Sequence, residues 1–134
     1  MPHLAHVALL VPDYDDALSY YVGRLGFTLV EDTPQPEQNK RWVTIRPPGA
    51  GPDATTILLA RAATPEQARV VGDQAGGRVF LFLHTDDFAR DHARLTEAGV
   101  DWVRPPAVHP YGTVAVFRDL YGNLWDLVEP ARAP

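Results

Sequence analysis

Near its end the chain reads FRDLYGNLWDLVE, from Phe117 to Glu129. Short runs of β-branched, aromatic and aliphatic residues flank the segment Asp119–Asn123, and such runs are typical of strands. The segment itself contains Asp, Gly and Asn, which tight turns favour because they tolerate unusual backbone angles or bond to their own backbone. We therefore predict a hairpin of two strands, at 112–117 and 124–128, joined by a turn at Asp119–Asn123.

Upstream of this hairpin, one order of elements is predicted to occur twice. Apolar runs and alternation predict strands, carboxylates before an apolar helical face predict helix starts, and glycines after that face predict helix ends. The first copy has a predicted strand at 6–11, a helix from Asp13 to Gly26, and strands at 27–30, 41–46 and 55–60. The second has a strand at 78–83, a helix that Asp86 and Asp87 cap and Gly99 ends, and strands at 100–103, 112–117 and 124–128. The proline-containing segments 33–39 and 105–110 are predicted to be loops.

The two copies align at an offset of 73 residues, which places Asp13 on Asp86 and Gly26 on Gly99. Two copies at so long a period indicate a duplicated unit, because solenoid repeats span about 20–50 residues. A helix covers one face of each sheet, and if the opposite face curls, two units side by side can enclose a concave cleft for a small molecule between sheet edges. We predict an α+β fold of two tandem βαβββ modules, forming a curved mixed sheet with a cleft. The predicted arrangement is a single domain over 1–134, with modules at about 4–62 and 78–130 and a connector at 63–77.

Composition excludes several classes of function. The chain lacks cysteine, which rules out disulfides, thiol nucleophiles and cysteine-ligated metals. Its net charge of −5 and its single lysine, Lys40, argue against nucleic acid as a partner and weakly favour a cationic ligand. No apolar run approaches the ~20 residues that cross a bilayer, so no membrane partner is expected. The first residues show no basic region followed by an apolar core, so we expect a cytoplasmic protein.

Both ends of the chain resemble one protein family. The strand His6–Val11 followed by Pro12-Asp13, a helix carrying Tyr20 and Tyr21, and a stop at Leu25-Gly26-Phe27 resemble the opening of vicinal-oxygen-chelate proteins. This superfamily includes glyoxalase I, extradiol dioxygenases and bleomycin-resistance proteins. The stretch Phe117–Glu129 resembles their Asp-Pro-x-Gly-Asn hairpin and last strand, with Leu120 in place of the usual proline. The resemblance covers about residues 4–130 and implies the fold predicted above, as well as a homodimer.

In the metalloenzymes of that superfamily, the resemblance implies four ligand positions, a His in the first strand and a Glu in the last strand of each half. Carried over, these positions read His6, Leu58, Val79 and Asp126. Two of the four could ligate a metal, whereas a catalytic site usually keeps three protein ligands. We therefore expect no cofactor and no metal. The alternative is Zn, Ni, Fe or Mn, with His6 and Asp126 as weak candidate ligands.

Five residues are predicted to contact a ligand. Asp126 should face away from its apolar neighbours Trp125 and Leu127, toward the cleft. If it meets His6 there, the pair could act as a general base with an orienting carboxylate, and both are candidate catalytic residues. The predicted ligand-binding residues are His6, Trp42, His109, Tyr111 and Asp126.

Three functions fit these residues. The favoured one is a binder of a small organic molecule without the full metal site, like the antibiotic-sequestering bleomycin-resistance proteins. The alternative is an enzyme, either a metal-dependent lyase, isomerase or dioxygenase with a degenerate ligand set or a metal-free catalyst that uses His6 and Asp126. The third is a partner-binding protein whose cleft is vestigial. The residues do not identify the ligand or substrate.

Overall fold

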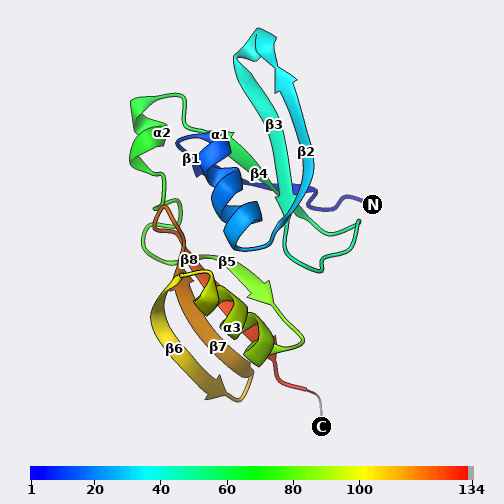
Figure 1. Ribbon diagram of the computed structural model, residues 1–134, viewed down its shortest axis with the longest axis vertical. Helices are drawn as coiled ribbons and strands as arrows, with labels where there is room; N and C mark the ends of the chain where they lie inside the picture. Colours follow the sequence, from blue (N-terminus) through cyan, green and yellow to red (C-terminus); the bar gives the residue numbers. More distant parts are fainter. Residues whose placement is uncertain (133–134) are drawn as a thin grey trace. The chain divides into compact units, whose positions relative to one another are not determined.

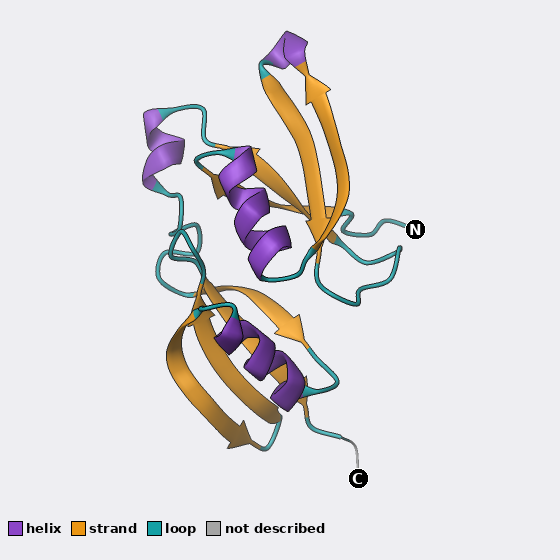
Figure 2. Ribbon diagram, in the orientation of Figure 1, coloured by secondary structure: helices purple, strands orange, loops and turns teal. Residues whose placement is uncertain are grey.

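The computed structural model describes residues 1–132, which form two compact units. The first unit is Met1–Val71, and the second begins at Gly72. Each has one four-stranded mixed sheet with helix packed against one face (Figures 1 and 2). All strands of the two units lie within the predicted module limits, and the α+β architecture of two tandem units is confirmed. That the units form a single domain stays a prediction. None of the described helices is long and apolar enough to cross a bilayer.

The sheet of the first unit has the order β1-β4-β3-β2. Strand β1 runs parallel to β4, and the other neighbours are antiparallel. The elements are β1 (His6–Val11), α1 (Tyr14–Leu18) continued by a π-helical segment (Ser19–Arg24), β2 (Thr28–Gln35), a 3₁₀ turn (Pro36–Gln38), β3 (Lys40–Arg46), β4 (Thr56–Arg61) and α2 (Pro65–Arg69).

The second unit repeats this plan in the order β5-β8-β7-β6. Strand β5 runs parallel to β8, and the remaining pairs are antiparallel. The elements are β5 (Val79–His84), α3 (Phe88–Glu97), β6 (Asp101–His109), β7 (Gly112–Arg118) and β8 (Leu124–Pro130).

In both units the core lies between the sheet and its helix. Successive strand residues point to opposite faces, so alternate residues of the other strands pack against the helix, whereas β2, β5 and β6 have no buried residue. The buried side chains include Leu9, Val11, Tyr21, Val43, Ile45 and Leu59 in the first unit and Leu95, Phe117, Trp125 and Leu127 in the second. The opposite face of each sheet, here called the open face, carries the intervening residues.

The predicted offset of 73 residues holds at some points and is wrong at one. The first strands begin 73 residues apart, at His6 and Val79. The N-caps are Asp13 and Asp87, which are 74 residues apart, so Asp13 does not correspond to Asp86. A bulge between Val79 and Leu81 inserts one residue into β5. The π-helical segment Ser19–Arg24 inserts one into the first helix, and Gly26 and Gly99, both at positive φ, are again 73 apart.

The predicted loop at 105–110 is wrong over most of its length, and the one at 33–39 is wrong at its first three residues. Strand β2 continues to Gln35 and includes Pro34, and β6 continues through Pro105 and Pro106 to His109. Proline cannot donate a ladder hydrogen bond, but both strands are sheet edges, where one side needs no partner. The pairing of β6 with β7 shifts between Arg104 and Ala107, which accommodates the two prolines.

The turn between β7 and β8 is organised by one buried carboxylate, that of Asp119, which is 5% exposed. Its Oδ1 accepts from the backbone N–H groups of Tyr121, Gly122 and Asn123 at 2.9–3.0 Å. Its Oδ2 accepts from Asn123 Nδ2 at 3.1 Å and from Trp125 Nε1 at 2.9 Å. The Asp-x-x-Gly-Asn spacing therefore fixes the hairpin and holds the indole of Trp125 in the core.

Candidate functional site

Strand pairing defines which residues of the two open faces are equivalent. His6 is opposite Thr56 in the β1–β4 ladder, and Val79 is opposite Leu124 in the β5–β8 ladder. Leu58 lies two residues after Thr56, and Asp126 lies two residues after Leu124. The four ligand positions implied by the resemblance are thus equivalent in the two units, His6 to Val79 and Leu58 to Asp126.

These residues do not fit the four-ligand set of the metalloenzymes. The side chains of Leu58 and Val79 have no atom that can coordinate a metal. Among residues 1–132, no three His, Asp or Glu side chains gather as a metal site would require. No catalytic step through a metal is therefore derived for this chain.

On the open face of the first unit, His6 and Trp42 lie together. Nδ1 of His6 is 2.5 Å from Oγ1 of Thr56, and the rings of His6 and Trp42 meet edge to face with centroids 5.4 Å apart. His6 is on β1 and Trp42 on β3, and β4 lies between these strands. The two rings therefore meet over β4. Thr44, which is opposite Leu58 on this face, is only 2% exposed.

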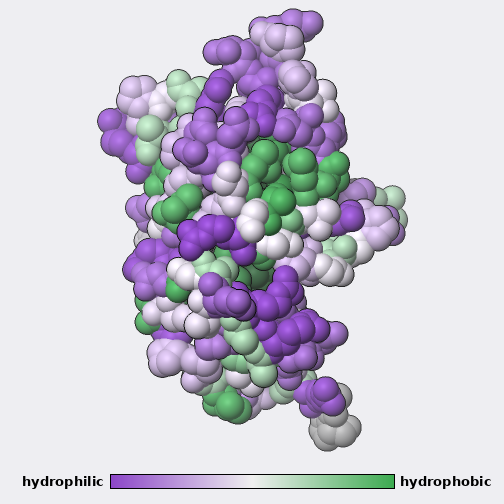
Figure 3. Space-filling view, viewed as in Figure 1, coloured by the Kyte–Doolittle hydropathy of each residue, from purple (hydrophilic) through white to green (hydrophobic). Residues whose placement is uncertain are grey.

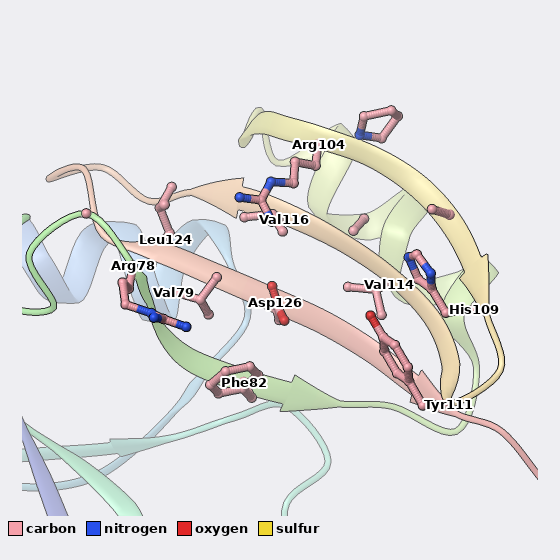
Figure 4. A pocket seen from close by; sticks show the side chains of 14 residues that line it. Arg78, Val79, Phe82, Arg104, His109, Tyr111, Val114, Val116, Leu124 and Asp126 are labelled. Carbon is pink, nitrogen blue, oxygen red and sulfur yellow. The ribbon is translucent and has the colours of Figure 1, made fainter.

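In the first unit, His6 and Thr56 also line a pocket of about 530 Å³, together with residues 3–5 and 52–54. The open face of the second unit is different. It holds a pocket of about 500 Å³ whose lining includes Val79, Val114, Val116, Leu124 and Asp126 (Figure 4). Thr44 is opposite Leu58 in the first unit, and Val116 is opposite Asp126 in the second. Trp42 and Val114 each lie two residues before these positions, so Val114 is the equivalent of Trp42. A small side chain therefore stands in the second unit where the first has an indole.

Asp126 lies in the middle of this pocket, on β8 (Figure 4). Its neighbours Trp125 and Leu127 are 1% and 2% exposed, so the prediction that Asp126 faces away from them is confirmed. Burial among apolar side chains raises the pKa of the Asp126 carboxyl, and the positive charge of Arg104 partly opposes this. The carboxylate is thus the acidic group on a floor of valine and leucine.

The two ends of the pocket differ in chemistry (Figure 4). Arg78 and Arg104 lie toward one end, and His109 and Tyr111 lie at the other. The rings of His109 and Tyr111 are stacked in parallel, with centroids 5.0 Å apart and planes 4° apart. Phe82 on β5 adds a further ring, which is 62% exposed.

The predicted site residues thus fall into two groups. Asp126, His109 and Tyr111 line one pocket in the second unit, and His6 and Trp42 lie together in the first. The pairing of His6 with Asp126 joins residues of different units and stays a prediction.

Sequence reasoning missed Phe82 and Arg104. Bulges after Val79 and between Trp102 and Arg104 reverse the alternation of faces along β5 and β6. Arg104 therefore reaches the pocket, whereas Trp102 stacks on His92 of α3. Simple alternation would place Trp102 and Arg104 on one face, so no signal in the sequence reveals Arg104 as a lining residue.

Comparison with known proteins gives close relatives over nearly the whole chain. A protein of Shewanella frigidimarina (strain NCIMB 400), named "Uncharacterized protein", is 58% identical over 126 residues, covering 94% of this chain and 92% of the relative. The crystal structure of TnmS3, an antibiotic binding protein from Streptomyces sp. CB03234, is 33% identical with a TM-score of 0.76 and covers 98% of both chains.

A second solved structure is from Sphaerobacter thermophilus DSM 20745, a member of the glyoxalase/bleomycin resistance protein/dioxygenase superfamily. It is 34% identical with a TM-score of 0.78, covering 96% of this chain and 98% of that one. Residues 3–127 match the family described as "Glyoxalase/Bleomycin resistance protein/Dioxygenase superfamily". The resemblance seen in the sequence is confirmed, and the chain belongs to this superfamily.

Proposed function

We propose that this chain binds a small organic molecule in the pocket on the open face of its second unit, without a metal ion. The observation that carries the proposal is the pocket itself, about 500 Å³ in volume, with an apolar floor around the single carboxylate of Asp126. Small-molecule sites typically have volumes of about 300–1,000 Å³ and combine apolar walls with a few placed polar groups.

The relatives support a binding function. TnmS3, 33% identical to this chain, is an antibiotic binding protein. The leucine and valine at positions 58 and 79 favour such a role over the alternative of a metal-dependent lyase, isomerase or dioxygenase. Metal analysis of the purified protein tests this choice. Stoichiometric Zn, Ni, Fe or Mn that is lost on Asp126→Ala would favour the enzyme and overturn the metal-free proposal.

A substitution that fills the pocket with a larger side chain tests whether the ligand binds there. Val114→Trp introduces in the second unit the indole that the first carries at the equivalent position, so the sheet should tolerate it. N-phenyl-1-naphthylamine, a neutral aromatic dye, serves as the probe, and its affinity is measured by fluorescence titration. We expect Val114→Trp to weaken binding by about tenfold or more, because the ring would displace the dye.

The matched control is Val108→Trp, since Val108 is on the neighbouring strand β6, is 83% exposed and is not among the residues lining the pocket. It should leave the affinity unchanged. Equal affinities in the wild type and Val114→Trp would place the dye elsewhere and contradict the proposal.

We also propose that the chain forms a homodimer. Each sheet has edge strands, β1 and β2 in the first unit and β5 and β6 in the second, whose outer backbone groups have no neighbour in their own sheet. On the first unit, Figure 3 shows hydrophobic residues gathered beside α1 and β2, and Leu29 and Val30 of β2 are each 44% exposed. The mass in solution, measured by light scattering, decides between monomer and dimer.

A further inference from the structure

The charge of the pocket in the second unit is opposite to that of the whole chain. The chain carries a net charge of −5 at pH 7. The charged side chains that line the pocket are those of Arg78, Arg104 and Asp126. Two guanidinium groups against one carboxylate leave a local excess of positive charge, which attracts anions more strongly than the distant acidic surface repels them, because salt screens distant charges.

Neither of the two pocket arginines forms a close ion pair with a described residue, although the charge of Arg104 acts on Asp126 from a longer distance. Several arginines elsewhere are neutralised, for example Arg41 by Asp32 at 2.7 Å and Arg118 by Asp101 at 2.7 Å. No carboxylate within residues 1–132 lies within 4.0 Å of the guanidinium nitrogens of Arg78 or Arg104. Both side chains are exposed and can turn toward a ligand.

Aromatic surface lies beside these charges. Phe82 and Tyr111 are 62% and 63% exposed, although rings of this size are usually covered. Tyr111 is held by its parallel stacking on His109, so little conformational entropy is lost when a flat ring covers it. In Figure 4, Tyr111 lies on one side of Asp126, and Phe82 lies on the other side, toward Arg78.

We infer that the ligand of this pocket is an aromatic acid, with its anionic group at Arg78 and Arg104 and its ring system against Phe82 and Tyr111. A hydroxyl, amine or amide donor on the same molecule meets the carboxylate of Asp126. This inference rests on the proposed function and names its ligand class. It reverses the expectation of a cationic ligand that the net charge suggested.

The experiment compares two dyes that differ by one anionic group, 1-anilinonaphthalene-8-sulfonate and N-phenyl-1-naphthylamine. Titration calorimetry at about 50 mM salt should give an affinity at least about fivefold higher for the sulfonate, and this advantage should shrink at about 0.5 M salt. Arg104→Gln should remove most of the advantage. Asp126→Asn should raise the ratio of the sulfonate's affinity to that of the neutral dye about threefold, because it removes a negative charge from the pocket while both dyes lose the same N–H contact.

The control is Arg94→Gln, which removes an equally charged side chain from α3 that does not line the pocket. It should leave both affinities unchanged. If the neutral dye binds as tightly as the sulfonate, or if Arg104→Gln and Arg94→Gln act alike, the inference is wrong while the proposed function stands. If Val114→Trp weakens neither dye, or neither binds the wild type, the proposed function fails and the inference fails with it.

Discussion

The open faces of the two sheets carry opposite chemistry at equivalent positions. In the first unit, the polar residues His6, Thr56 and Thr44 surround Leu58. In the second, the apolar residues Val79, Leu124 and Val116 surround Asp126. One duplicated plan has therefore given one face with an apolar centre and polar surroundings, and another with a carboxylate at the centre of an apolar floor.

The difference extends to the space above the strands on each face. In the first unit, polar groups bond to one another, as His6 does with Thr56, and the rings of His6 and Trp42 meet over β4. In the second, Val114 stands where Trp42 would, and the space is left as a pocket. The two copies of one plan thus differ in the side chains that cover the open face of each sheet.

The units also differ in the connection between their third and fourth strands, and the largest predicted effect lies there. In the second unit, Asp119 holds a short turn through hydrogen bonds from Tyr121, Gly122, Asn123 and Trp125. Asp119→Ala leaves several buried donors without an acceptor. We expect the free energy of unfolding, measured by urea titration with circular dichroism, to fall by about 3 kcal/mol or more.

The first unit supplies the control for Asp119. Its connection between β3 and β4, residues 47–55, is longer, and Asp53 in it is exposed. Asp53→Ala should change the free energy of unfolding by no more than about 0.5 kcal/mol. A similar loss for both variants, or a loss below about 1 kcal/mol for Asp119→Ala, would show that the carboxylate does not organise the turn.

A second contrast concerns two glycines with nearly the same backbone angle. Gly72 has φ +79° and Gly49 has φ +77°, so an L side chain is strained at either position. A Cβ at Gly72 would lie 1.8 Å from the backbone oxygen of Tyr121, whereas one at Gly49 would meet nothing within 4 Å.

Replacing each glycine by alanine therefore separates backbone strain from steric clash. Gly49→Ala should cost about 1 kcal/mol, and Gly72→Ala about 2–3 kcal/mol, because backbone must also move in the second case. Melting temperatures by calorimetry give the comparison. Equal losses would mean that the segment at Gly72 moves freely away from Tyr121.

The sequence predicted much of this fold because the signals were local. The Asp13 cap, the glycines Gly26 and Gly99 and the turn after Asp119 each follow from residue chemistry that needs no distant partner. The parts it did not predict depend on tertiary context. Pro34, Pro105 and Pro106 read as loop residues, and only the edge position of β2 and β6 makes them compatible with strands.

In the candidate site, too, local patterns predicted some residues, whereas others depend on tertiary context. The orientation of Asp126 followed from the alternation of β8, which has no bulge. Arg104 and Phe82 could not be placed, because a single inserted residue in β6 or β5 exchanges the two faces of everything after it. Whether a strand contains such a bulge depends on its partner strand, so the residues on one strand alone do not reveal it.

The smallest predicted effect sharpens the contrast between Asp126 and Leu58, because only the carboxylate makes its sheet sensitive to pH. Burial raises the pKa of Asp126 in the folded state above the 3.8 of the free side chain, against the opposing charge of Arg104. The folded state therefore binds the proton more tightly than the unfolded state. Relative to Asp126→Asn, the wild type should lose stability as the pH rises from about 3.8 through the raised pKa.

Arg104→Gln tests the cause of this pH dependence. Arg104 is the charged group that opposes the shift, so its removal should raise the pKa of Asp126 further and extend the loss of stability to higher pH. Urea titrations from pH 4 to pH 7 on both backgrounds, with the carboxyl carbon of Asp126 followed by NMR, measure the stability and the titration separately. A difference between wild type and Asp126→Asn that stays flat or grows in favour of the wild type as the pH rises would mean that the carboxylate is well solvated. The chemical asymmetry of the two open faces would then carry no energetic consequence.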